Sequence, residues 1–190
     1  MEIYLVRHTK PLIEKGVCYG QTDIPVDAGV FEASARQVLE ELPEKTDALY
    51  SSPLTRCSCL ADYIRENKYR GMSIEHSSLL KELHFGDWEN KKWDAINHVD
   101  LQKWMNDFVN LSPHGGESYV ALHHRTRQFL QLLKERNFGC VVLVTHAGVI
   151  RSIQSHIRHI LLKDTFELNC DYGKVVKLIQ NVEGREFNIT

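Results

Sequence analysis

The sequence lacks the features that mark disulfide-rich, secreted or membrane-spanning proteins. Its five cysteines are odd in number and form no C-x-x-C pair, so they predict neither a disulfide framework nor a zinc knuckle. No apolar run is long enough to cross a bilayer, and no secretory signal precedes the first predicted strand. We therefore expect a cytoplasmic protein without a membrane partner.

Neither sign of charge dominates the chain. Lys and Arg number 23 against 25 Asp and Glu, a formal charge of −2, so no basic field exists that would recruit nucleic acid. Any anion-binding property must therefore be local. With 190 residues, of which 43% are hydrophobic, the chain fits one domain over residues 1–190 with a sizeable core.

Two short apolar runs that end near a histidine carry the functional prediction. Residues 3–6 precede Arg7 and His8, and residues 141–144 precede His146 by one position. Such runs, rich in β-branched residues, predict strands buried on both faces. Open α/β sheets bind ligands at the carboxyl ends of their strands, and neighbouring strands lie about 4.8 Å apart. If the two strands are neighbours, both imidazoles line one cavity.

The alternation of strand and helix patterns predicts a doubly wound α/β fold, with a mostly parallel central sheet and helices on both faces. Short strands are expected at 47–50 and 73–76. Residues 172–180 and 185–189, separated by Asn-Val-Glu-Gly, resemble a terminal hairpin. The sheet is therefore expected to be mixed.

Residues 88–112 differ in composition from the rest of the chain. They contain all three tryptophans, and residues 101–109 have the spacing of a short amphipathic helix. We expect a small helical excursion that lies over the site. The tryptophans are predicted to serve packing more than recognition, although their faces can stack on a heterocyclic base.

Two further side chains are predicted to join the histidines. Ser52 is a candidate N-cap and Pro53 a candidate first helical residue of the helix that follows the 47–50 strand. Helical side chains lean toward the N-terminus, so Arg56 can reach back over the edge of the sheet. Glu82, flanked by leucines before a glycine turn, can supply a carboxylate in partly apolar surroundings.

Two arginines, two histidines and one carboxylate suit the chemistry of a phosphate monoester. Arg7 and Arg56 would bind phosphate oxygens through their planar forks. His8 would attack phosphorus to give a phosphohistidine that water hydrolyses, while His146 donates to the developing charge. Glu82, protonated in the complex, would give its proton to the leaving alkoxide and later take one from water.

The motifs around these residues resemble, in order, those of the histidine phosphatase (phosphoglycerate mutase-like) superfamily. They are L-V-R-H-T at 5–9, S-S-P-L-T-R-C at 51–57, E-L-H-F-G-D-W-E at 82–89, G-G-E-S at 115–118 and T-H-A-G-V-I-R at 145–151. The resemblance implies a phosphohistidine mechanism without metal or organic cofactor. It implies His8 as nucleophile and Glu82 as proton donor. The phosphate ligands that it implies are Arg7, Arg56, His146 and Ala147.

Two loops resemble one group of enzymes within this superfamily more than the others. Y-G-Q-T-D-I-P at 19–25 and F-G-D-W-E at 85–89 are most similar to alpha-ribazole phosphatases, which remove the 5′-phosphate from the lower-ligand nucleoside in cobalamin assembly. The expected partner is thus a small phosphorylated substrate, with Gln21 and Thr22 as weaker substrate contacts. The protein is expected to be a monomer or a homodimer.

Three positions depart from the superfamily's pattern. Thr9 stands where many members have glycine, and His114 precedes Gly-Gly-Glu-Ser where proline is usual. Glu14 stands where many members have an asparagine beside the phosphate. Its negative charge predicts a local geometry, or a substrate, that differs from theirs.

Several alternatives remain open. A phosphoglycerate mutase would share the covalent step but return the phosphoryl group to an alcohol, and a sugar-phosphate phosphatase of the same superfamily would differ in the alcohol alone. A metal-dependent hydrolase is disfavoured because Arg7 and Arg56 would repel a cation. A third class is a non-catalytic phosphate-binding domain, but the presence of both a candidate nucleophile and a candidate acid argues against it.

Overall fold

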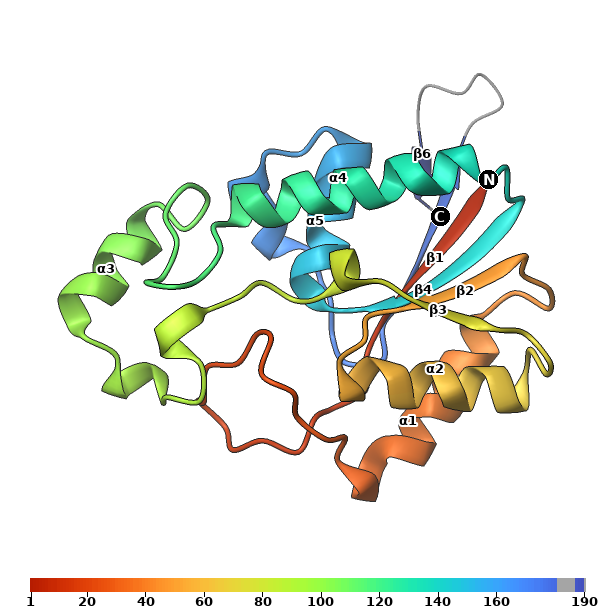
Figure 1. The fold of residues 1–190 in the computed structure, drawn as a ribbon, viewed down its shortest axis with the longest axis horizontal. Helices are drawn as coiled ribbons and strands as arrows, with labels where there is room; N and C mark the ends of the chain where they lie inside the picture. The colour runs from red at the N-terminus through yellow and green to blue at the C-terminus, as the bar shows by residue number, and fades with distance from the viewer. Residues whose placement is uncertain (181–186, 190) are drawn as a thin grey trace.

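A six-stranded sheet organises the computed structural model, which describes residues 1–180 and 187–189 (Figure 1). In order across the sheet the strands are β3 (Ile74–His76), β2 (Ala48–Ser51), β4 (Cys140–Thr145), β1 (Glu2–Arg7), β5 (Val175–Gln180) and β6 (Phe187–Ile189). The first four are parallel, β5 is antiparallel to β1, and β6 is antiparallel to β5. The predicted mixed, mostly parallel sheet is confirmed. The predicted turn at 181–184 lies outside the described residues.

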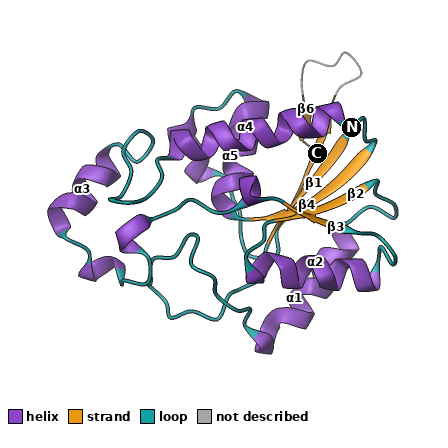
Figure 2. Ribbon diagram, in the orientation of Figure 1, coloured by secondary structure: helices purple, strands orange, loops and turns teal. Residues whose placement is uncertain are grey.

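Helices cover both faces of the sheet, as Figure 2 shows. One face packs against α1 (Ala28–Glu41) and α2 (Thr55–Asn67), and the other against α4 (Tyr119–Glu135) and α5 (Ala147–Arg158). Along β1, Ile3 and Leu5 face α4 and α5, whereas Tyr4 and Val6 face α1 and α2. Because both faces are buried, the strand is a continuous apolar run rather than an alternating one.

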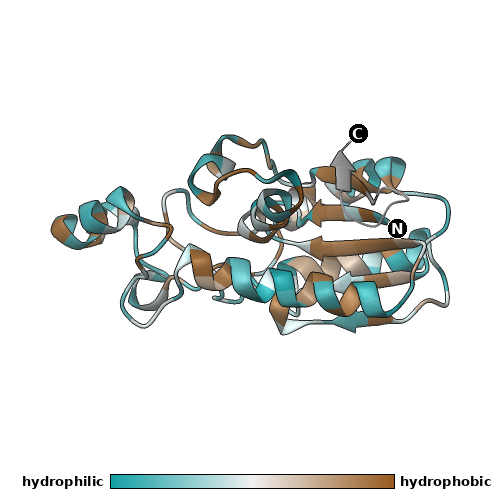
Figure 3. Cartoon of the chain, turned by 90° about the horizontal axis from the view of Figure 1, so that it is seen from above, coloured by the Kyte–Doolittle hydropathy of each residue, from teal (hydrophilic) through white to brown (hydrophobic). Residues whose placement is uncertain are grey.

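The predicted excursion extends beyond the carboxyl ends of the strands, at the end of the molecule away from the N-terminus (Figure 3). Its helix is α3 (His98–Asn106). The three tryptophans, Trp88, Trp93 and Trp104, pack with Cys18 and Ile96 in a small separate core. Short 3₁₀ turns complete the chain at Ser78–Leu80, Gly86–Trp88, Trp93–Ala95 and Leu162–Glu167. No helix in the described part of the chain is long and apolar enough to cross a membrane.

The start of α2 differs from the prediction. Leu54 occupies the N-cap position and Thr55 is the first helical residue, so Ser52 is not the cap and Pro53 is not helical. The carboxylate of Asp23 accepts hydrogen bonds from the amide and the hydroxyl of Thr55, both at 2.7 Å. A side chain from another loop therefore caps this helix, which leaves the Ser52 hydroxyl available to the histidine at the end of β4.

Candidate active site

The ends of β1 and β4 meet, because the two strands are parallel neighbours in which Arg7 pairs with Thr145. His8 and His146 therefore follow their strands at the same level. Their ring centroids lie 5.1 Å apart, with the rings inclined at 64°. Both side chains are buried, with 2% and 0% of their surface exposed. The adjacency that the sequence required of these strands is confirmed.

The contacts of His8 fix which ring nitrogen is free to react. Nδ1 donates to the backbone carbonyl of Thr9 at 2.7 Å, which leaves Nε2 with its lone pair. The Nε of Arg56 donates to that Nε2 at 3.3 Å. Burial, followed by the charges of Arg56 and Arg7, holds the pKa of His8 well below its usual value. The imidazole is therefore neutral at neutral pH, as a nucleophile must be.

The guanidinium groups of Arg7, which is partly buried, and Arg56, which is fully buried, flank the histidines without a carboxylate partner among the described residues. Arg56 is fully buried and donates to the carbonyls of Gly20 and Thr22, at 2.5 and 3.0 Å. Arg7 donates to the carbonyl of Cys170, and its Nε has no hydrogen-bond partner in the described part of the chain. A buried cation whose hydrogen-bond partners are all neutral groups keeps much of its desolvation cost. A dianionic ligand between the two arginines would offset that cost.

The residues around His146 include two that the sequence analysis missed as neighbours. The Ser52 hydroxyl lies 2.8 Å from His146 Nε2, and the Cys57 thiol lies 3.4 Å from the same nitrogen. Burial, followed by the charges of His8 and Arg56, lowers the pKa of His146 well below its usual value. The motif at 145–151 identified His146, but only the folded structure shows that Ser52 and Cys57 lie next to it.

Two tyrosines far apart in the sequence also meet at the site. The Tyr172 ring centroid lies 4.0 Å from Arg7 Cζ and 5.6 Å from the His8 ring. Its hydroxyl is 2.6 Å from the Tyr19 hydroxyl, and Tyr19 in turn lies 5.3 Å from Arg56 Cζ. Both arginines thus rest against an aromatic face, an arrangement that favours the cation. No periodicity or motif in the sequence marks Tyr172.

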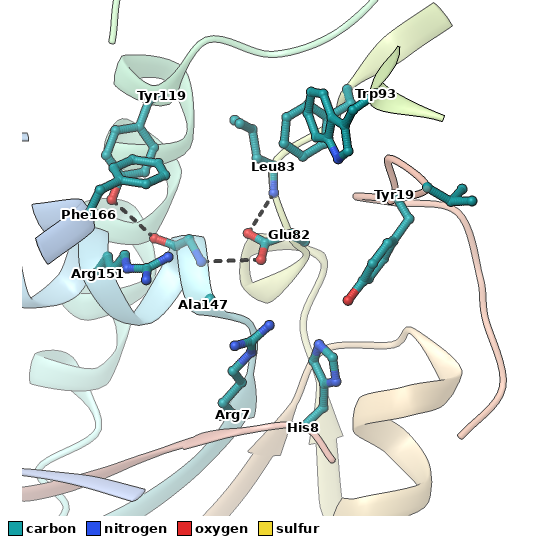
Figure 4. A pocket seen from close by; sticks show the side chains of 13 residues that line it. Arg7, His8, Tyr19, Glu82, Leu83, Trp93, Tyr119, Ala147, Arg151 and Phe166 are labelled. Carbon is teal, nitrogen blue, oxygen red and sulfur yellow. Dashed lines mark hydrogen bonds between the residues drawn. The ribbon is translucent and has the colours of Figure 1, made fainter. Parts of the chain in front are cut away.

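Glu82 faces the histidine across the pocket, on an irregular segment between the 3₁₀ turns at 78–80 and 86–88 (Figure 4). Its two carboxylate oxygens accept from the amides of Leu83, at 2.9 Å, and Gly148, at 3.2 Å. Gly148 lies in the first turn of α5, and a β-carbon there would collide with the carboxylate. The motif glycine therefore makes room for the candidate acid.

The pocket has a volume of about 220 Å³ and an aromatic wall. Arg7, His8 and Glu82 surround its inner part, and Ala147 at the start of α5 also lines it. Five rings form the outer wall: Tyr19, Phe85, Trp93, Tyr119 and Phe166. The excursion thus contributes one tryptophan to the pocket, while α3 itself lies farther out.

Residues 3–189 match the model of a protein family described as the histidine phosphatase superfamily, branch 1. The chain belongs to this superfamily. It is 27% identical to a putative phosphoserine phosphatase 2 of Hydrogenobacter thermophilus, over 97% of this chain and 91% of that protein. It is 28% identical to the adenosylcobalamin/alpha-ribazole phosphatase of Salmonella typhimurium, over 79% of this chain and 76% of that protein. The enzyme is therefore a phosphoric monoester hydrolase.

A solved structure supports the fold of this histidine phosphatase. The crystal structure of a putative alpha-ribazole-5′-P phosphatase from Escherichia coli aligns with a TM-score of 0.89. The alignment covers 100% of this chain and 94% of that one, at 21% sequence identity. A likeness at this identity shows the phosphoglycerate mutase-like fold, and substrate choice needs a separate argument.

Gln21 and Thr22 lie behind Arg56 in this histidine phosphatase and do not line the described pocket. The Glu89 carboxylate accepts from their two amides, at 2.8 and 2.5 Å, and from the Thr22 hydroxyl. The Gln21 side chain donates to the carbonyl of Glu82 at 3.1 Å. These bonds fix the loop whose carbonyls hold Arg56. A direct substrate contact of either residue stays a prediction.

Two of the three departures from the superfamily pattern, Glu14 and His114, have local partners. Glu14 forms an ion pair with Lys92 at 2.6 Å, is 66% exposed and does not line the pocket. Its charge is therefore directed to Lys92 in the excursion rather than into the pocket. His114 is exposed and bonded to Asp87 at 2.8 Å, whereas Thr9 is fully buried.

The two buried histidines should make the fold of this histidine phosphatase sensitive to acid. Both pKa values lie well below 6.5 in the folded chain. The unfolded chain therefore binds protons that the folded chain excludes, and the free energy of unfolding should fall as pH drops below 6.5. The limiting slope is about 1.4 kcal/mol per pH unit for each histidine. Urea unfolding at stepped pH measures it. His8→Ala should give a shallower slope, and an unchanged slope would contradict a neutral His8.

Proposed function

We propose that the protein hydrolyses phosphate monoesters through a phosphohistidine on Nε2 of His8. The observation that carries this proposal is a neutral, buried imidazole whose Nε2 accepts from Arg56, with Arg7 in the same pocket and a second imidazole beside it. Arg7 and Arg56 bind the phosphate oxygens bidentately. His146 and the amide of Ala147, at the N-terminus of α5, add donors where negative charge develops.

The first step transfers the phosphoryl group to the protein. When phosphate binds, Arg56 Nε exchanges its bond to His8 for a bond to a phosphate oxygen, which frees the lone pair of Nε2. That lone pair forms the P–N bond while the P–O bond to the alcohol breaks. Glu82 gives its proton to the leaving oxygen.

The second step returns the site to its starting state. Water attacks phosphorus, and Glu82 takes the proton of that water as the P–N bond breaks. His8 recovers its lone pair, and inorganic phosphate leaves. One carboxyl group therefore serves as acid and then as base, so the cycle consumes only the ester and one water.

For the substrate we propose alpha-ribazole 5′-phosphate. The name of the Salmonella relative and the loop motifs at 19–25 and 85–89 support it. The aromatic wall supports it too, because rings such as Trp93 and Phe166 can stack on a benzimidazole base. The name of the Hydrogenobacter relative suggests phosphoserine, which carries an ammonium group. Glu82 is the one carboxylate in the described lining of the pocket, and it serves as the acid. No second carboxylate in that lining is therefore left to pair with the ammonium group.

Steady-state rates on alpha-ribazole 5′-phosphate, phosphoserine and a sugar phosphate test the substrate. We expect the largest kcat/KM for alpha-ribazole 5′-phosphate, with stoichiometric release of inorganic phosphate. Phe166→Leu should lower that value about 10-fold, the worth of one stacking contact, and leave the phosphoserine rate unchanged. A higher kcat/KM on phosphoserine would contradict the proposed substrate. Transfer of phosphate between alcohols without its release would indicate a mutase.

A further inference from the structure

The Gly-Gly-Glu-Ser motif at 115–118 has no part in the steps above, yet its glutamate is held firmly. Glu117 and Arg125 form a bidentate ion pair, from Nε to Oε1 at 2.8 Å and from Nη2 to Oε2 at 2.9 Å. Their side chains are only 16% and 15% exposed. Paired forks of this kind are more directional than a surface ion pair and can fix the position of what they bind.

The remaining bonds of this pair go to the segment that carries Glu82. Arg125 donates to the carbonyl of Leu79 at 2.8 Å and to the carbonyl of Glu82 itself at 3.0 Å. The backbone amide of Glu117 donates to the carbonyl of His84 at 2.8 Å, and its carboxylate accepts from the His84 amide at 3.4 Å. The pair therefore binds the backbone before, at and after the candidate acid.

The glycine of the motif explains how Glu117 comes so close. A β-carbon on Gly116 would lie 2.6 Å from the His84 carbonyl and 3.0 Å from the Gly86 amide. Only a residue without a side chain lets these two stretches of backbone touch. The glycine permits the approach, and the glutamate one position later makes the contact with the backbone and with Arg125.

The segment around Glu82 needs such support because it is irregular backbone that belongs to no strand. Among the described residues, the Glu82 carboxylate accepts hydrogen bonds only from the amides of Leu83 and Gly148. A shift of about 1 Å in a reacting group can cost on the order of 100-fold in rate. The position of the backbone at Glu82 therefore decides whether the carboxyl reaches the leaving oxygen.

We propose that Arg125 and Glu117 are positioning residues that hold the Glu82 carboxyl against the leaving-group oxygen. The proposal rests on the acid role assigned to Glu82. A positioning role can be distinguished from a general stabilising role by the leaving group of the ester. A misplaced acid lowers kcat/KM for esters whose alcohol needs a proton to leave. The value of kcat/KM for an ester whose leaving group needs no proton is unaffected, because it reports only the steps up to the phosphoenzyme.

The test compares 2-phenylethyl phosphate, which leaves as an alkoxide, with p-nitrophenyl phosphate, which leaves as a stable phenolate. Arg125→Lys keeps the charge but loses the fork, and should lower kcat/KM on the first ester by about 10- to 100-fold, with the second nearly unchanged. Glu117→Gln, which loses the paired carboxylate, should do the same and serves as the second variant if Arg125→Lys folds poorly. Arg127→Lys, an exposed residue of the same helix, is the matched control and should change neither rate.

A double-mutant cycle completes the test. In a Glu82→Gln background, Arg125→Lys should cause no further loss on 2-phenylethyl phosphate, because the group it positions is gone. Equal losses on both esters, or additive losses in the double variant, would overturn the positioning role. If Glu82→Gln alone slows both esters equally, the acid role fails first, so the two failures can be told apart.

Discussion

Replacing His8 by alanine should lower kcat by about 10⁴- to 10⁶-fold, the loss seen when a covalent nucleophile is removed. The Cys57 thiol cannot take over the attack, because it is fully buried beside His146. Burial raises the pKa of that thiol far above neutrality, so it stays protonated and unreactive. The whole covalent pathway therefore depends on one imidazole.

Rapid quenching with ³²P-labelled substrate checks this result directly. The wild-type enzyme should yield an acid-labile phosphoprotein that turns over, and His8→Ala should yield none. His124→Ala, which removes an exposed histidine on α4, is the matched control and should behave as wild type. Inorganic phosphate should still raise the melting temperature of His8→Ala, because both guanidinium groups remain to bind it. Turnover at the wild-type rate in His8→Ala would contradict the phosphohistidine mechanism.

The parts of this fold that could be predicted are those with strong local patterns. β1 and β4 are continuous apolar runs because both of their faces are covered, and a run of this kind needs no partner to be recognised. The sites at their ends follow from the geometry of parallel sheets. Strand order is a different matter: only the observed pairing of Arg7 with Thr145 shows that His8 and His146 share a level.

The parts that could not be predicted depend on contacts between distant segments. Ser52 has the local signature of an N-cap, but Asp23 from another loop caps the helix and Ser52 bonds to His146. The sequence predicts that the charge of Glu14 lies beside the bound phosphate, but in the structure Glu14 forms an ion pair with Lys92 in the excursion. In each case tertiary contacts outweigh a local preference, and no spacing in the chain records the partner.

Replacing Glu82 by glutamine should divide the substrates by their leaving groups. The value of kcat/KM reports the steps up to the phosphoenzyme, so for 2-phenylethyl phosphate it should fall by about 10²- to 10⁴-fold. For p-nitrophenyl phosphate it should stay within a few-fold, because the phenolate leaves unprotonated. The amide keeps the shape of the side chain and one acceptor for the amides of Leu83 and Gly148. Glu135→Gln, an exposed change at the end of α4, should alter neither value.

The same variant should also expose the second role of Glu82. Without a base to accept a proton from water, the phosphohistidine should accumulate when p-nitrophenyl phosphate is the substrate. A burst of about one p-nitrophenol per enzyme should then precede a slow steady state, so that kcat falls while kcat/KM does not. If kcat and kcat/KM fall together on both esters, the carboxyl does not move protons in either step, and Glu82 serves only to shape the pocket.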